Sequence, residues 1–214
     1  MGRRVDHETK QQIERAARGL FLAKGFRAAS YAEIAEAIGR QKSYVQRHFP
    51  KKEIFVEHFF QDLLDETDQF LAARGYDPDA HAENLYRIGV IQYSFLFHSP
   101  ELRRFTREIL ASREWTESLI QKDMQWAAEY LSGMGLKDPA QSAALVMGGV
   151  YEVLYQHLTA GTEPDPYELQ ATAMHLYGDL LGAAPEPSFS QDLLPLSMRD
   201  SAVEYLQKVL FDKN

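Results

Sequence analysis

The chain has 214 residues, of which 45% are hydrophobic and 25% charged, a composition typical of a folded protein with one large or two small domains. It contains no cysteine, which excludes disulfides, iron–sulfur clusters, thiolate metal sites and cysteine nucleophiles. Its net charge of −8 argues, as an average, against a nucleic-acid partner, and the lack of a long apolar run predicts a cytoplasmic protein that does not enter a membrane.

Apolar residues recur at helical spacing along nearly the whole chain and no stretch alternates with a period of two, so we predict an all-α fold. The first four helices are expected at about residues 8–24, 30–38, 41–48 and 52–73. Ser30, with Glu33 three residues later, predicts a capping box at the start of the second helix. Gly39 ends that helix after two turns. Two short helices joined by a glycine turn, after a longer helix, are typical of a helix-turn-helix.

The rest of the chain continues as helices. Their expected ranges are about 80–98, 101–113, 115–131, 139–160, 167–181 and 197–211. Asp138 followed by Pro139 is a strong start signal, because the aspartate caps a helix and proline suits its first position. Gly133-Met134-Gly135 is expected to break the chain, and residues 183–188 to form a linker. The predicted domains are a helix-turn-helix domain (1–52), a helical effector-binding and dimerisation domain (53–182) and a C-terminal extension (183–214).

The charge is divided unevenly between these parts. Residues 1–55 carry twelve Lys and Arg against six Asp and Glu, a net charge of +6. The other 159 residues carry 11 basic and 25 acidic side chains, a net charge of −14. A basic segment joined to an acidic body is expected of a DNA-binding head whose body is repelled by phosphates. The alternative is a chance patch of solvated charges.

The third helix has only Val45, His48 and Phe49 as evident core anchors. The remaining side chains offer donors, acceptors and an aromatic ring to a DNA groove. The candidates for groove contacts are Lys42, Ser43, Tyr44, Gln46 and Arg47. Arginine pairs with guanine, glutamine pairs with adenine, and a tyrosine ring contacts a thymine methyl group or a phosphate.

Four further residues are candidates for the DNA backbone or the minor groove. Ser30 and Lys52 each stand at the start of a helix, where anions are favoured, and are expected to hold phosphates. Arg3 and Arg4 are expected to reach the minor groove as a mobile arm. A solvated surface side chain is the alternative for each. Glu33 is read as a capping residue and not as a base reader.

The N-terminal region resembles the DNA-binding domain of the TetR family over about residues 9–60. The matching positions are Ala17, Leu20-Phe21, Gly25-Phe26, Ser30, Ile34-Ala35, Gly39, His48-Phe49 and Lys52-Glu53. The sequence departs from the family at Arg40, where a small apolar residue is usual, and at Gln46, where tyrosine is usual. The DNA target is therefore not carried over from the family.

This resemblance implies a homodimer, formed through a four-helix bundle of about residues 139–181 from each copy, that binds a palindromic double-stranded DNA operator. The sequence permits a partner to approach the first of these helices. Its broad apolar surface consists of Met147, Gly148, Gly149, Val150, Tyr151, Leu154 and Leu158. The alternative is the buried core of a monomer. The extension, longer than usual for the family, is expected to pack on the dimer or to wrap its partner.

A cavity for a small apolar effector is expected between the middle helices, where aromatic side chains with polar tips gather. The candidate lining residues are Phe70, Tyr93, Phe97, Trp115, Trp126, Tyr130, Met147, Tyr151 and Tyr155. Aromatic residues at this spacing also fit an ordinary core. No His, Asp and Glu cluster has metal-ligand spacing, so we expect neither metal nor cofactor. An exposed, salt-bridged helix face is expected to consist of Glu101, Arg103, Arg104, Arg107 and Glu108.

Four functional hypotheses follow. The first, implied by the resemblance, is a repressor whose effector favours a conformation that no longer matches DNA half-sites about 34–36 Å apart. The second is a DNA-binding regulator controlled by a protein partner, with a filled core in place of the cavity. The third is a helical enzyme, against which stands the lack of any phosphate-binding loop, nucleophile elbow or metal motif. The fourth is a helical interaction protein that never binds DNA.

Overall fold

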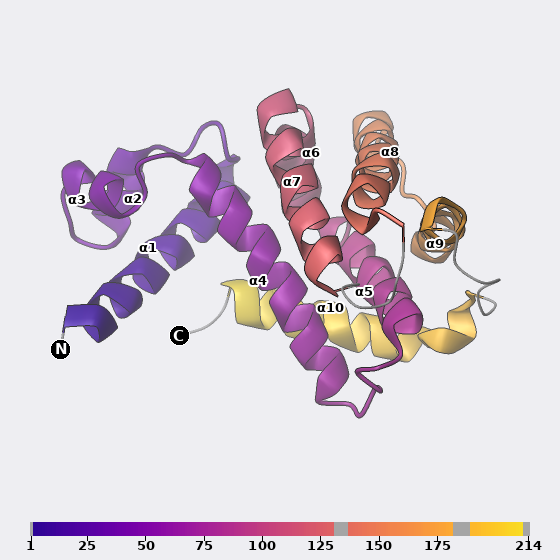
Figure 1. Cartoon of the computed structure of the whole chain (residues 1–214). Coiled ribbons are helices and arrows are strands. Elements are labelled where there is room, and N and C mark those ends of the chain that lie inside the picture. The colour runs from indigo at the N-terminus through magenta and orange to yellow at the C-terminus, as the bar shows by residue number, and fades with distance from the viewer. Residues whose placement is uncertain (1, 131–136, 182–188, 212–214) are drawn as a thin grey trace.

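The computed structural model describes residues 2–130, 137–181 and 189–211, and over these residues it is helical without a strand, as predicted. The α-helices are α1 (Gly2–Lys24), α2 (Tyr31–Ala37), α3 (Lys42–His48), α4 (Glu53–Ala72), α5 (His81–Leu96), α6 (Pro100–Leu110), α7 (Arg113–Tyr130), α8 (Pro139–Ala160), α9 (Pro166–Leu181) and α10 (Leu196–Phe211), with a short 3-10 helix at Gln191–Leu193. Helices α1 to α3 form a head, and α4 leads from it into a body of α5 to α10 (Figure 1).

The head is held together by a small apolar core. Ile13 and Phe21 of α1, Ile34 of α2 and Val45 of α3 are buried together. Phe21 lies edge-on to Phe26, with ring centroids 4.8 Å apart. Because α2 and α3 are too short to be stable alone, their position depends on these contacts.

Local signals start and end several helices as predicted. Ser30 and Glu33 form the expected capping box, in which each side chain accepts a hydrogen bond from the other residue's backbone N–H. The Asp138 side chain accepts the Gln141 N–H at 3.0 Å and Pro139 takes the first position of α8. Gly161 ends α8 with a φ of 71°, in the left-handed region where glycine has no Cβ penalty.

Helix α1 begins earlier than predicted. It starts at Gly2, so Arg3 and Arg4 lie in its first turn and not in an arm ahead of it. Residues 3–18 contain no proline or glycine, which is why the sequence permits this continuation. The side chains of both arginines lie outside the described residues, as do the predicted break at 133–135 and the linker at 183–188. No helix among the described residues is long and apolar enough to span a membrane.

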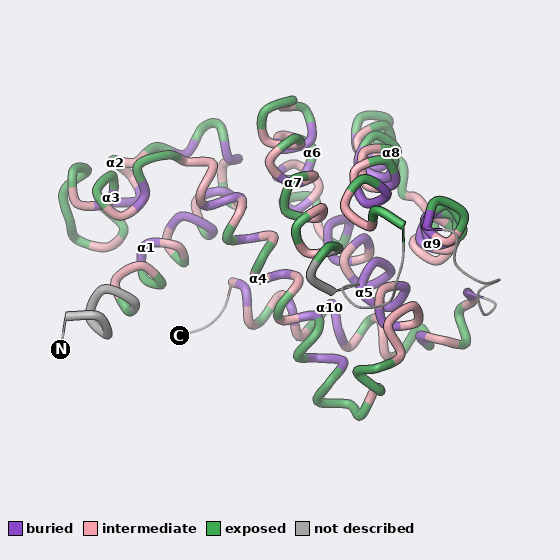
Figure 2. Tube along the Cα trace, viewed as in Figure 1, coloured by how far each residue is buried: buried purple, intermediate pink, exposed green. Residues whose placement is uncertain are grey.

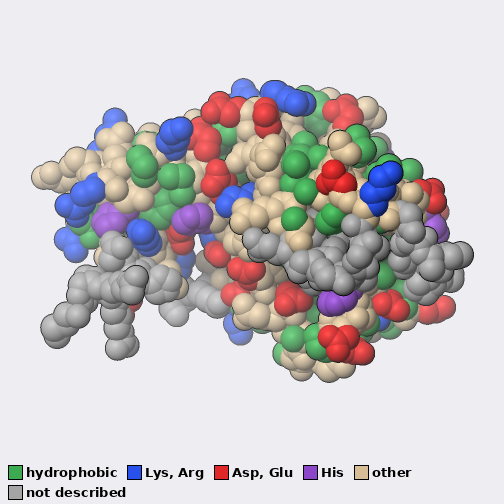
Figure 3. Space-filling model, viewed as in Figure 1, with side chains coloured by type: hydrophobic (Ala, Val, Ile, Leu, Met, Phe, Trp, Pro, Cys, Tyr) green, Lys and Arg blue, Asp and Glu red, His purple; other side chains and the backbone are tan. Residues whose placement is uncertain are grey.

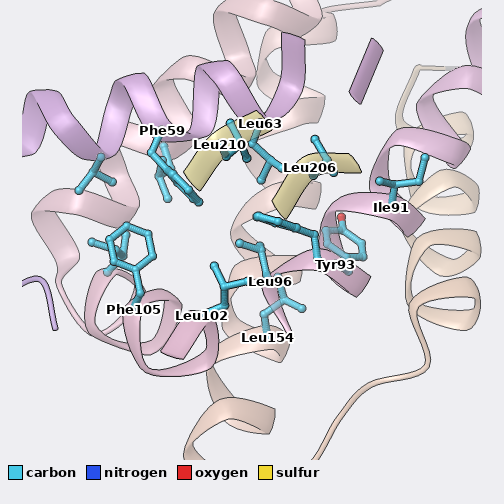
Figure 4. Packing of buried hydrophobic residues seen from close by; sticks show 14 of the residues in the cluster. Phe59, Leu63, Ile91, Tyr93, Leu96, Leu102, Phe105, Leu154, Leu206 and Leu210 are labelled. Carbon is cyan, nitrogen blue, oxygen red and sulfur yellow. The ribbon is translucent and has the colours of Figure 1, made fainter. Parts of the chain in front are cut away.

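Helix α10 corrects the expectation for the C-terminal extension. It packs against α4 and α5 of its own chain, burying Ala202, Leu206 and Leu210. Figure 4 shows Leu206 and Leu210 near Leu63 of α4, and Figure 2 shows buried residues, in purple, along α10. The apolar face of α10 therefore completes the core of this chain. An interaction with a second copy is not needed to explain it.

Candidate DNA-binding surface and effector cavity

Helix α3 presents one polar face to solvent. Lys42, Ser43, Gln46 and Arg47 are exposed, whereas Val45 has no exposed surface and anchors the helix in the head. The carbonyl of Val45 accepts the N–H of Phe49 at 2.9 Å, which ends the helix. Four of the five residues predicted to contact a groove are thus on a fixed surface.

Tyr44, the fifth, is half-buried between two guanidinium groups. Its ring centre lies 5.4 Å from Arg40 and 5.3 Å from Arg47, and its hydroxyl lies 3.4 Å from Thr9 Oγ1 of α1. Cation–π attraction at these distances orients both arginines. Arg40, the departure from the family pattern, therefore has a role here that a small apolar residue does not fill.

Ser30 is exposed, but its hydroxyl is already engaged at the start of α2. It donates to Glu33 Oε2 at 2.7 Å and accepts the Glu33 N–H at 3.3 Å. Hydrogen bonds from Lys24, and then from Ser30, lower the pKa of the Glu33 carboxyl to about 2. Glu33 thus acts as a cap, as the sequence indicates, and it also forms an ion pair with Lys24 that the sequence did not predict.

Lys52 is placed differently from the expectation. Its ammonium group donates to the carbonyl oxygens of Phe26 at 2.5 Å and Ala29 at 2.8 Å, and lies 4.4 Å from the Phe26 ring centre. Burial lowers its pKa. The reason is that the loop after α1 has carbonyl groups without helical partners, which this side chain satisfies. Lys52 therefore closes the loop within the head, and we do not assign it a phosphate.

The surfaces of the head and the body differ in charge. Figure 3 shows Lys and Arg side chains gathered over the end formed by α1 to α3, while Asp and Glu are frequent over the body. This matches the division in the sequence between +6 over residues 1–55 and −14 over the remainder. Phosphates are therefore attracted to one end of the molecule.

The head is joined to the body by polar contacts from α6. Glu108 accepts the backbone N–H of Arg27 at 2.9 Å, and the Arg104 guanidinium donates to the carbonyl of Leu22. A Cβ built on Gly25 comes 2.5 Å from the Glu108 carboxylate, so the loop and α6 are closely apposed. Arg104 and Glu108 thus correct the expectation of an exposed face, because unpaired backbone groups after α1 require partners.

A cavity of about 90 Å³, partly open to solvent, lies between α4, α5, α7, α8 and α9. Four residues predicted to line an effector cavity line this one, namely Tyr93, Trp126, Met147 and Tyr151. The volume of this cavity is small beside the roughly 300–1,000 Å³ of sites for drug-sized ligands, so an effector would have to widen the cavity.

The other predicted lining residues lie elsewhere. Phe70 packs against Tyr205 of α10, with centroids 5.4 Å apart, and Trp115 packs against Phe26 of the head at 4.6 Å. Phe97 faces a separate surface hollow, and Tyr155 is half-buried outside the cavity. The Tyr130 side chain lies outside the described residues. These aromatic residues are core or surface, the alternative that their spacing left open.

Sequence reasoning missed the polar residues of the cavity, of which Asp123 is the most unusual. Its carboxylate accepts a hydrogen bond from the Tyr151 hydroxyl at 2.7 Å. The residue as a whole is half-buried because the cavity reaches it, but the carboxylate is removed from bulk water, and this desolvation raises its pKa from 3.8 to about 7. Its position four residues after the buried Leu119 was the available signal, since that spacing places both on one helix face.

Helices α8 and α9 keep an apolar face exposed, but not the one predicted. Val150, Tyr151, Leu154 and Leu158 are buried in this chain's own core. The exposed apolar residues are Leu145 (61% exposed) and Val153 of α8, and Leu176 (51% exposed) and Leu180 of α9. Helix α8 is apolar on two sides, which periodicity alone does not separate. Gly149, exposed between Leu145 and Val153, has no side chain to keep a neighbour away.

These features define a helix-turn-helix head on an all-helical body with an internal cavity. Residues 13–59 match the model of the bacterial regulatory proteins of the tetR family. The N-terminal domain therefore carries the sequence pattern of this family, which confirms the resemblance seen in the sequence.

Solved structures share the fold over about four fifths of the chain. One is SmeT, the repressor of the Stenotrophomonas maltophilia multidrug efflux pump SmeDEF, with 18% identity, 83% of this chain and 96% of that chain covered, and a TM-score of 0.53. Another is a TetR-family regulator from Streptomyces coelicolor A3, with 23% identity, 81% and 94% covered, and a TM-score of 0.52. No curated protein sequence matches the chain. At these identities the structures establish the fold alone.

Proposed function

We propose that this protein is a dimeric, sequence-specific DNA-binding transcription regulator, a repressor that a small ligand releases from its operator. The observation that carries the proposal is the exposed polar face of α3, which Val45 anchors at the basic end of an otherwise acidic chain. A helix of this kind fits the major groove, where Lys42, Gln46 and Arg47 have the chemistry to read base edges. Ser43 and Tyr44 lie between Lys42 and Gln46 on the same helix.

Dimerisation is supported by the exposed apolar face on α8 and α9. Leu145 and Val153 are eight residues, or about two turns, apart on α8. On α9, Leu176 and Leu180 are also exposed apolar residues. Large apolar side chains in one patch are costly in water and mark interaction sites. A second copy provides a self-complementary partner, since a two-fold axis brings identical patches together.

Release of DNA by a ligand is supported by helix α4, which runs from the head to the wall of the cavity. This helix contributes Glu57, Phe60 and Leu64 to the cavity, while Phe55 and Val56 near its start are buried toward the head. A ligand that shifts α4 also shifts the head, provided that it binds the two conformations unequally. The cavity favours this mechanism over a regulator controlled only by a protein partner.

The test is selection of bound fragments from random DNA by the purified protein, compared with the double variant Lys42→Ala and Arg47→Ala. We expect enrichment of a palindromic site by the wild type and loss of that enrichment in the variant. Arg113→Ala, which removes an exposed charge of α7, serves as the control and should select the same site. No enrichment by the wild type at low salt would refute the proposal.

A further inference from the structure

The cavity between α4, α5, α7, α8 and α9 is lined mainly by apolar side chains, together with a few charged ones. Phe60, Leu64, Ile88 and Leu119 form part of the apolar wall. Among the described residues, the charged ones that line it are Glu57 of α4 and Lys122 and Asp123 of α7, which together give a formal charge of −1. Such walls favour an apolar ligand body, and the charge disfavours an anionic one.

The Asp123 carboxylate has no cationic partner among the residues that the structure describes. Its hydrogen bond from Tyr151 is neutral, and no lysine or arginine in the described part of the chain forms an ion pair with it. A desolvated carboxylate is costly unless it is protonated or paired with a positive charge. The protein keeps this carboxylate in the wall of the cavity, where a bound cation would offset the cost of its desolvation.

Gln170 of α9 adds a second acceptor without a donor. Only 4% of the residue is exposed, and its Nε2 donates to the carbonyl of Leu85 at 3.0 Å. Its Oε1 is buried and has no hydrogen-bond partner among the described residues. A Cβ on Gly89 would collide with the Gln170 amide, so the amide is packed in place against α5. A ligand with N–H groups would satisfy this oxygen.

Aromatic rings complete the surroundings of the carboxylate. Tyr93, Trp126, Tyr151 and Tyr177 line the same cavity. Burial first, and then the nearby charge of Asp123, raise the pKa of the Tyr93 and Tyr177 hydroxyls. Ring faces attract cations, which adds to the attraction of the carboxylate.

We propose that the cavity binds an apolar organic cation with N–H donors, an aromatic ammonium compound, with Asp123 as its counter-ion and Gln170 Oε1 as a second acceptor. The inference rests on the proposed function in that this cavity is the effector site. It goes further by assigning the ligand's charge.

Three probes of one shape test the charge. They are 2-naphthylmethylammonium, its neutral counterpart 2-naphthylmethanol, and the anion 2-naphthoate, titrated into the dimeric protein by calorimetry near pH ~8, where the Asp123 carboxyl is ionised. We expect the ammonium probe to bind at least about tenfold more tightly than the alcohol, and the anion to bind most weakly. Equal or tighter binding of the alcohol or the anion would overturn the inference, as would failure of all three to bind.

Variants assign the effect to Asp123. Asp123→Asn should weaken the ammonium probe about tenfold or more and change the alcohol by less than about threefold. Tyr151→Phe removes the hydrogen bond but keeps the charge, so it should retain the preference for the ammonium probe. Glu114→Gln, which removes an exposed carboxylate of the same helix, is the control. An unchanged preference in Asp123→Asn would refute the counter-ion.

DNA release separates this inference from the proposed function. If the ammonium probe binds through Asp123 but leaves the selected operator bound, the cation site stands and ligand-induced release fails. If the alcohol binds as well as the ammonium probe and releases DNA, the effector function stands and the inferred cation selectivity is wrong.

Discussion

Replacing Asp123 with asparagine should stabilise the fold, by an amount that grows with pH. Desolvation raises the folded-state pKa of this carboxyl from 3.8 to about 7. At pH values between 3.8 and about 7, Asp123 holds a proton in the folded protein that it has released in the unfolded chain. The contribution of Asp123 to stability is therefore fully present below its unfolded pKa, falls as pH rises through this window, and is lost above about pH 7.

The size of the effect follows from the same values. A rise from 3.8 to about 7 corresponds to roughly 4 kcal/mol, at about 1.4 kcal/mol for each tenfold change in proton affinity. This is an upper bound because the cavity is partly open to water. Asparagine has nearly the shape of the protonated acid, and its side-chain oxygen can accept the Tyr151 hydroxyl hydrogen bond. The variant should match the wild type near pH ~4 and exceed it by up to about 4 kcal/mol near pH ~8.

Urea denaturation at a series of pH values measures this difference. Asp68→Asn changes an exposed carboxylate of α4 and controls for the loss of one negative charge. The difference between Asp123→Asn and the wild type should increase with pH, whereas the difference for Asp68→Asn should stay within about 0.5 kcal/mol. A difference for Asp123→Asn that is flat with pH, or a less stable variant near pH ~8, would refute the desolvated carboxylate.

Three further predictions concern other parts of the molecule. In urea denaturation, Leu206→Ala should lower the free energy of unfolding by about 2–5 kcal/mol. Leu196→Ala, at an exposed position of the same helix, should change it by under about 1 kcal/mol. Equally small effects of both variants would mean that α10 contributes little to stability. If the proposed dimer forms through this face, Leu176→Asp should convert it to a monomer in sedimentation measurements, and a persisting dimer would rule out this face of α9. Gly25→Ala should lower the free energy of unfolding by about 1–3 kcal/mol, because Gly25 has a φ of 96° and lies against Glu108. Glu108→Ala, added to this variant, should restore part of that loss. Full tolerance of Gly25→Ala would contradict the close approach of the loop and α6.

The helices and their ends were predictable because their signals are local. The Ser30 capping box and the Asp138-Pro139 start each lie within a few residues, and the structure has both. The exposed face of α3 was also predictable, since one buried residue, Val45, leaves the polar side chains toward solvent. Such patterns are decided by the backbone of one helix.

The remaining features depend on residues far apart in sequence. Lys52 contacts carbonyl groups 23 and 26 positions earlier, and the hydroxyl that contacts Asp123 is 28 positions later. Helix α8 is apolar on two sides, so the sequence does not tell the face that contacts α7 from the face that carries Leu145. Only the packing of the other helices decides these cases.

The salt dependence of DNA binding tests the central claim most directly. Fluorescence anisotropy with the selected operator measures affinity at several salt concentrations for the wild type, Arg47→Ala and the control Arg113→Ala. Affinity should fall steeply as salt rises, Arg47→Ala should bind roughly tenfold or more weakly at about 0.1 M salt, and Arg113→Ala should match the wild type. An affinity independent of salt, or unchanged binding by Arg47→Ala, would contradict the assignment of α3 as the DNA-reading helix.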